Sequence, residues 1–326
     1  MRRYILARLA WAGPIVVAIV VATFFIIHIV PGDPVQALVG DFPTPPGYIE
    51  QVRKDFGLDQ PITTQLWLYL ANLSQGNLGY SFSNRQPVLD LVFDRARFTL
   101  LLMIPALTLA AILGVSMALA AAPRAGGLVD SGITALSVVG FSIPIFWLGQ
   151  ILVIAFAIQL PWLPAQGMVS ARQALTGWPW ARDVLWHMVL PVFSITIFYV
   201  AIVARVARAS VLEALSQDFV LTARAKGLGR RAVLWQHVLP NAMIPVVTVI
   251  GYNFGHSLTG AILVETVFAW PGLGSLFITS IGNRDYPVLL GIFLVTAIAV
   301  VIANLITDVL YAALDPRVRS SYGSHG

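Results

Sequence analysis

The sequence predicts an all-α integral membrane protein with six transmembrane helices. Its mean hydropathy is +0.81, 58% of its residues are hydrophobic and only 11% are charged, which is unlike an ordinary soluble domain. Apolar runs long enough to cross a bilayer also recur along the 326 residues. Because lipid offers no hydrogen-bond partner to the backbone, and because the strict alternation of a barrel strand is absent, we expect helices. We expect a single membrane domain over residues 1–326.

Each expected span is long enough to cross a hydrocarbon core of about 30 Å. The spans cover residues 9–30, 98–122, 132–160, 184–204, 242–264 and 288–310. The first is too long for the hydrophobic region of a signal peptide and lacks a clear small-residue cleavage site before Pro31. We therefore expect it to stay in the protein as an anchor.

The basic residues predict that both termini lie on the cytoplasmic side. With the N-terminus inside, most arginines fall in the inner segments, whereas the short outer loops hold only Arg172, Arg182 and Arg284. Loops rich in arginine and lysine stay in the cytoplasm. In a membrane chain the position of each charge matters more than the net charge of +5. Basic residues interleaved with aromatics on a soluble face, which nucleic-acid binding needs, are absent.

The first outer loop, residues 31–97, is expected to fold into a small external cap. A short helix is predicted over residues 45–56, entered through Pro45 and Pro46 and ended by Gly57. A second is predicted over residues 61–73, where leucines recur at helical spacing. The cap is either a lid on the membrane domain or a surface that receives an external partner.

Several kinds of chemistry are excluded by composition. The chain has no cysteine, so disulfides, thiolate metal sites and cysteine nucleophiles are excluded. A P-loop needs a lysine followed by serine or threonine, but the lysines are Lys54 before Asp55 and Lys226 before Gly227. We expect no enzyme activity, no metal and no cofactor held by this chain.

Polar residues inside the spans are candidates for a transport path, because ionisable groups at bilayer depth are costly and usually functional. Of His28, His256, Glu265 and Asp308, only His256 is expected to lie deep. Asn253 lies three residues before His256 and shares its helix face. Ser142 in the third span is a further candidate. An interhelical hydrogen bond is the alternative reading of such residues.

A basic, helix-prone segment, residues 209–240, separates the fourth and fifth spans and is expected to be a cytoplasmic loop. Leu221, Arg224, Ala225 and Leu228 fall at i, i+3, i+4 and i+7, which predicts an amphipathic turn along the membrane face. Gly227 can adopt the positive φ that ends a helix. A short helix, a glycine break and a second helix would make a protruding elbow.

This segment resembles the EAA loop of ABC importer permeases, in which a glycine is followed ten residues later by an I-x-L-P ending. Here Gly227 is followed by His237, Val238, Leu239 and Pro240, and Leu221, Thr222 and Ala223 stand where the general family has Glu-Ala-Ala. TARAKGL is the form typical of the dipeptide, oligopeptide and nickel branch.

Further motifs of that branch occur in order along nearly the whole chain. They are IVPGDP (29–34), FGLDQP (56–61), GNLGYS (76–81), GFSIPIFWLG (140–149), ETVFAWPGLG (265–274), RDYP (284–287) and LDPRV (314–318). The chain is most similar to the first permease subunit of a peptide importer, the subunit with a long external loop after its first helix.

The resemblance implies a type I importer permease fold in a bacterial cytoplasmic (inner) membrane. It also implies a second homologous permease, two ATP-binding subunits or one fused ATPase that hold ATP and Mg, and an external solute-binding protein. The residues that would couple to the ATPase are Leu221, Thr222, Ala223, Arg224, Ala225, Lys226, Gly227, Leu239 and Pro240.

The implied function is ATP-driven peptide import, with this chain forming half of the translocation path. Nickel-chelate or glutathione import by the same kind of complex is an alternative. A proton-coupled secondary peptide transporter that uses His256, Glu265 or Asp308 is a rival, and a membrane scaffold without a transport role is a third possibility.

Overall fold

The computed structural model describes residues 2–29, 47–55, 57–81, 83–170 and 175–314. The elements are α1 (Arg2–Ile29), α3 (Tyr48–Asp55), α4 (Ile62–Ser74), β1 (Tyr80–Ser81), β2 (Gln86–Pro87), α5 (Val88–Ala121), η1 (Ala122–Arg124), α6 (Leu128–Ser142), α7 (Ile145–Leu152), η2 (Val153–Gln159), α8 (Gly177–Leu215), α9 (Asp218–Ala225), α10 (Arg230–Val233), η3 (Leu234–Val238), α11 (Leu239–Gly260), α12 (Ile262–Val267), α13 (Leu273–Gly282) and α14 (Tyr286–Leu314). η1 is a 3₁₀ turn, and η2 and η3 are π-helical.

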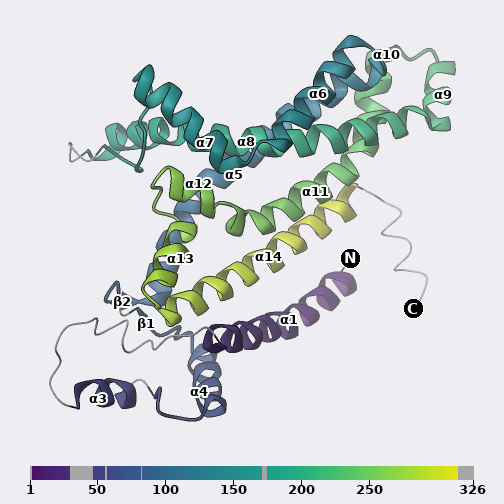
Figure 1. Ribbon diagram of the computed structural model, residues 1–326. Helices are drawn as coiled ribbons and strands as arrows, with labels where there is room; N and C mark the ends of the chain where they lie inside the picture. Colours follow the sequence, from purple (N-terminus) through teal and green to yellow (C-terminus); the bar gives the residue numbers. More distant parts are fainter. Residues whose placement is uncertain (1, 30–46, 56, 82, 171–174, 315–326) are drawn as a thin grey trace.

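The long helices pack in a chain of neighbours (Figure 1). α1 packs on α14, α14 on α11, α11 on α8, and α8 on both α5 and α6. α9 and α10 lie together at one end of the molecule, while α3, α4 and the β1–β2 hairpin lie at the opposite end. α1 begins and α14 ends toward the α9–α10 end. The chain therefore has two polar ends joined by apolar helices.

Within the described ranges, five helices are long and apolar enough to cross a membrane: Ala10–Ile29, Val88–Arg124, Gly177–Leu215, Arg230–Gly255 and Tyr286–Leu310. They correspond to five of the predicted spans. The predicted single helix at residues 132–160 is wrong, because α6 and α7–η2 meet at an angle of 95°.

The break follows from Pro144, which lacks an N–H group and disfavours helical backbone at Ile143. Ile143 is extended, with φ −81° and ψ 122°. The count becomes six only if this bent pair is one span.

Small residues let α5 and α8 approach closely. Ala106, Ala110, Gly114 and Ala118 recur every four residues along α5, and all are buried. A Cβ at Gly114 would lie 2.7 Å from Val203 Cγ1 of α8. Without a hydrophobic driving force between helices in lipid, such small-residue stripes allow the close packing that holds helices together.

Gly114→Leu is accordingly expected to destabilise the folded protein by about 1–3 kcal/mol, because the added side chain has no room against α8. The measurement is thermal unfolding of the detergent-purified chain. Gly132→Leu is the matched control, since nothing lies within 4 Å of a Cβ at Gly132. Equal unfolding temperatures for the two variants would contradict this account of the α5–α8 contact.

The segment between α1 and α5, which the sequence predicts to be an external cap, contains the two helices that the sequence predicts. α3 ends before Gly57, as expected. Gly57 has a φ of +65°, and the Leu58 N–H donates a hydrogen bond to Arg53 O at 2.9 Å, which closes the helix. Pro45, Pro46 and Phe56 lie outside the described residues.

In α4, Tyr69 stacks on Phe24 of α1 with 5.8 Å between ring centroids. The described part of the predicted cap therefore packs on the C-terminal end of α1.

Candidate coupling surface and transport path

The α9–α10 elbow, residues 218–233, has the helix, glycine break and second helix that the sequence predicts. α9 ends in a Schellman motif: Leu228 N–H bonds to Ala223 O at 3.2 Å and Gly227 N–H to Arg224 O at 2.9 Å. This motif requires a left-handed residue, and Gly227 has φ +82°. The turn alone thus favours glycine at this position, even without a partner.

The underside of the elbow belongs to the hydrophobic core of the chain. Val220 and Ala223 of α9 and Val233 of α10 are buried, 2 to 4% exposed, against Val211 and Ala214 of α8. Leu228 is half-buried beside them. The elbow is therefore attached to the end of α8 by a continuous apolar contact, and a displacement of one moves the other.

The outer side of α9 is exposed, and this reverses the predicted amphipathic face. Leu221 is 66% exposed, and Thr222, Arg224, Ala225 and Lys226 are also exposed. Ala223, which the resemblance places among the coupling residues, is only 4% exposed. The i, i+3 pair Val220 and Ala223 faces α8 instead.

Cationic side chains lie along the edge of the exposed face. Arg224 and Arg230 line a cavity of about 520 Å³ between α9, α10 and η1. Arg230 donates a hydrogen bond to the backbone oxygen of Pro123, so α10 is tied to the α5–α6 turn. Leu239 is the first residue of α11; it is half-buried and Pro240 is exposed.

The three candidate path residues are not gathered in one site. Asn253 is half-buried on α11 and donates to Val249 O of its own helix at 2.7 Å. His256 lies on the same helix, but its side chain is outside the described part. Ser142 lies at the end of α6 and donates to Val138 O at 2.8 Å.

Ser142 lines a small cavity of about 120 Å³ between α6 and α8, together with Thr134, Ser137, Arg205 and Arg208. Arg208 donates two hydrogen bonds to the Asp130 carboxylate, with 2.7 Å between Nη2 and Oδ2. This pair joins the first turn of α6 to α8 below the cavity.

Glu265, which the sequence offers as a packing residue or as a proton-coupling group, has a structural environment of its own. Glu265 of α12 is fully buried. Its Oε1 accepts from Thr99 Oγ1 of α5 at 2.6 Å, and its Oε2 accepts from the backbone of Gly274 and Ser275 at 2.7 and 3.1 Å. The carboxylate thus caps the open N–H groups in the first turn of α13.

These contacts tie α12 and α13 to α5. Thr99 Oγ1 also accepts from Leu273 N–H at 2.8 Å, and Trp270 Nε1 donates to Phe98 O at 2.9 Å. α12 lies outside the candidate spans. Burial raises the pKa of the Glu265 carboxyl to about 7, although its hydrogen bonds with Thr99, Ser275 and Gly274 favour the charged form.

Other sequence motifs meet at the same end. Ser81 in GNLGYS donates to Asp285 Oδ2 in RDYP at 2.6 Å, across 204 positions. Gly149 in GFSIPIFWLG leaves room for Phe268 of ETVFAWPGLG, since a Cβ there would lie 3.1 Å from Phe268 Cε2. The sequence identifies these residues as members of motifs, but the tertiary fold decides which motif contacts which.

Comparison with known proteins matches nearly the whole length of the chain. Residues 110–320 match the family model of the binding-protein-dependent transport system inner membrane component, and residues 1–103 match the N-terminal model of the same kind of membrane component. The chain is 37% identical to the dipeptide transport system permease protein DppB of Escherichia coli K12, over 98% of this chain and 99% of that protein.

Two further relatives are similar over nearly their full length. The glutathione transport system permease protein GsiC of Escherichia coli K12 is 39% identical over 98% of this chain and 99% of its own. The probable peptide ABC transporter permease protein y4tP of Sinorhizobium fredii is 36% identical, over 97% and 99% respectively.

One solved structure, an amino acid ABC transporter with histidines, has a TM-score of 0.51 at 16% identity and covers 69% of this chain and 94% of its own. It shows a shared fold.

Proposed function

Since this chain belongs to the family of binding-protein-dependent transport system inner membrane components, we propose that it is the permease subunit of an ATP-driven peptide importer. It forms half of the translocation path, and a second homologous permease forms the other half. Two ATP-binding subunits, or one fused ATPase, hold ATP and Mg and dock on the α9–α10 elbow. An external solute-binding protein delivers the peptide to the end that bears α3 and α4.

The coupling role rests on one observation: one side of the elbow is buried and the other is exposed. Its underside is part of the core at the end of α8, while Leu221 is 66% exposed on the outer side. Leu221 beside Arg224 and Lys226 gives this side both apolar and cationic groups for a partner to contact, which supports a docking role. A partner that grips this side would therefore move α8 directly, because the elbow and the helix end share one packed core.

Peptides are the favoured substrate class. The similar proteins named above are described as dipeptide, peptide and glutathione permeases. Import of glutathione, itself a short peptide, is the second candidate, supported by the 39% identity to GsiC. Uptake of a labelled dipeptide and of labelled glutathione into the same cells separates the two.

The proton-coupled rival has less support at Glu265, one of the three residues that it could use. It needs an ionisable group that is free to exchange protons with the substrate path, but the Glu265 carboxylate is enclosed by Thr99, Gly274 and Ser275 and is 0% exposed. These contacts give it a structural task. In an ATP-driven importer, the partner subunits supply the energy instead.

The test of the proposed function is the composition of the native complex. The tagged chain is purified from its own membranes in mild detergent, and every stoichiometric companion is identified by mass spectrometry. A second permease with ATP-binding subunits is the expected result. A solitary chain or a homo-oligomer, in preparations where other multisubunit transporters survive, would contradict the importer assignment.

A further inference from the structure

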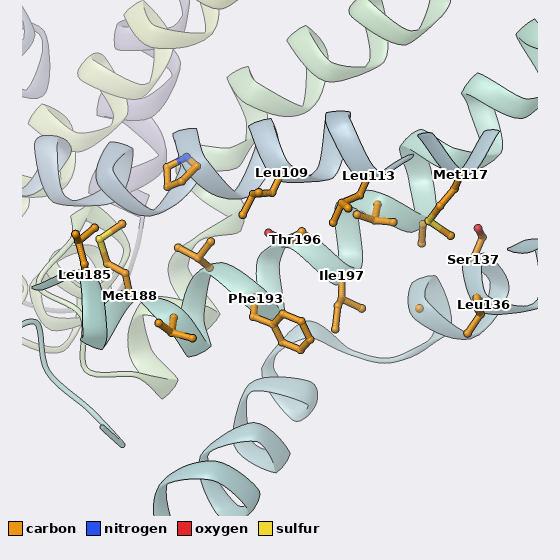
Figure 2. Close-up of a pocket in the computed structure, with 16 residues that line it drawn as sticks. Leu109, Leu113, Met117, Leu136, Ser137, Leu185, Met188, Phe193, Thr196 and Ile197 are labelled. Atoms are coloured by element: carbon orange, nitrogen blue, oxygen red, sulfur yellow. The ribbon is translucent and has the colours of Figure 1, made fainter. Parts of the chain in front are cut away.

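An apolar groove runs along the outside of the helix pair α5 and α8 (Figure 2). Its volume is about 680 Å³. Leu109, Leu113 and Met117 of α5 line one side, Phe193 and Ile197 of α8 line the other, and Leu136 of α6 lies near one end. The groove is laterally open, since Leu109 and Phe193 are 44 and 49% exposed.

The polar side-chain groups in the groove have no hydrogen left to donate. Ser137 Oγ donates to Ile133 O at 2.9 Å, and Thr196 Oγ1 donates to Ala106 O at 3.3 Å. A peptide has one N–H and one C=O group per residue, and burying these without partners is costly. The groove therefore fits a hydrocarbon chain and does not fit a peptide substrate.

A cation stands at one end of the groove. Ser137 and Ala201 line both the groove and the small cavity that contains Arg205, so the two spaces adjoin. Arg205 is exposed, and its guanidinium lies 5.4 Å from the centroid of the Phe141 ring. Arg208 beside it is paired with Asp130. Among the described side chains, no carboxylate pairs with Arg205.

The depth of Arg205 matches a headgroup. It directly follows the apolar stretch 184–204 of α8, and about 20 helical residues cover the hydrocarbon core. Basic side chains at this level attract the phosphates of anionic lipids. The end concerned is the one toward α9, because α8 continues from Arg205 to Leu215 and α9 begins at Asp218.

We propose that the α5–α8 groove binds an anionic phospholipid of the leaflet on the α9 side, with an acyl chain along the groove and its phosphate at Arg205. A helix of a second permease would also satisfy the apolar lining, but it would leave the charge of Arg205 without a counterpart. An anionic lipid fits both parts of the surface: its acyl chain fits the apolar lining, and its phosphate lies at Arg205. Bound there, it lies against α8, the helix that carries the elbow.

The experiment uses the purified complex with all its companion subunits, reconstituted in phosphatidylcholine nanodiscs. A trace of phosphatidylglycerol, or of phosphatidylcholine, carries a photoactivatable diazirine in its acyl chain. After irradiation, the lipid adducts on this chain are mapped by mass spectrometry. We expect adducts on groove residues of α5 and α8, with phosphatidylglycerol in about fivefold excess, the effect of one basic residue near a lipid surface.

Two variants and one control decide the outcome. Arg205→Gln should remove the excess of phosphatidylglycerol, and Leu109→Trp should lower the adducts of both lipids by filling the groove. Arg182→Gln, an exposed arginine at the opposite end of α8, should keep the excess.

Equal adducts of the two lipids, or an excess that survives Arg205→Gln, would overturn the phosphate site. The absence of groove adducts would overturn the lipid and indicate that a partner subunit covers the groove. The subunit composition of the same samples reports on the importer assignment separately, so the two failures are distinguishable.

Discussion

Gly227→Glu is expected to reduce peptide uptake to background while the chain still folds and inserts. A side chain at Gly227 meets nothing within 4 Å in this chain, and the cost of a non-glycine residue at φ +82° is about 1–2 kcal/mol. That cost is less than a typical stability of about 5–15 kcal/mol, so the chain is still expected to fold. The large effect comes from placing bulk and a negative charge on the surface that we propose meets the ATP-binding subunit. The measurement is uptake of a labelled dipeptide, normalised to the amount of the chain in the membrane.

Gly126→Glu is the matched control for Gly227→Glu. Gly126 has φ +79°, and nothing lies within 4 Å of a Cβ there, so the substitution adds the same strain and the same charge outside the elbow. Uptake should largely persist.

Gly227→Asn separates the effect of backbone strain from the effect of the lost contact, because asparagine tolerates a left-handed conformation. We expect the uptake of this asparagine variant to fall between that of the original protein and that of the glutamate variant; full uptake by Gly227→Glu would disprove the docking role.

Glu265→Ala should cause the largest loss of stability. It leaves Thr99 Oγ1 and the N–H groups of Gly274 and Ser275 without their buried acceptor, and each stranded group costs about 1–3 kcal/mol. A total of roughly 3 kcal/mol or more would remove a large part of a typical stability of about 5–15 kcal/mol. Thermal unfolding of the purified chain and its abundance in the membrane are the measurements.

Glu265→Gln is the control for the loss of the acceptor. Its amide oxygen can still accept from Gly274 and Ser275, so the cost should be about 1 kcal/mol. The difference between the two variants isolates the capping of α13 from the charge of the carboxylate. An alanine variant as stable as the original protein would show that Glu265 does not hold α12 and α13 against α5.

Sequence reasoning predicted the elements whose cause is local. The apolar runs at residues 98–122, 184–204 and 288–310 coincide with α5, α8 and α14, because each run is long enough to require a helix in lipid. Gly227 was predicted to end α9 for the same reason that it does: its backbone adopts positive φ without strain. These features depend on residues close to one another in the chain.

The misses depend on contacts between distant segments. The exposed face of α9 was predicted the wrong way round, because the apolar period alone does not say that α8 presents Val211 and Ala214 to Val220 and Ala223. The predicted third span overlooked the bend at Ile143, for which Pro144 was a visible signal. The role of Glu265 required the knowledge that Thr99, 166 positions earlier, lies beside it.

The most direct test of the account is a contact measurement at α9. The chain has no cysteine, so Leu221→Cys introduces its only thiol, at a position that is 66% exposed. This thiol is labelled with a benzophenone maleimide, the native complex is irradiated, and the adducts are identified by mass spectrometry. The account predicts an adduct with an ATP-binding subunit from Leu221→Cys, and little labelling of Ala223→Cys, whose site is buried. A complex that contains the ATP-binding subunit but forms adducts from Leu221→Cys only with lipid, or with no protein, would contradict it.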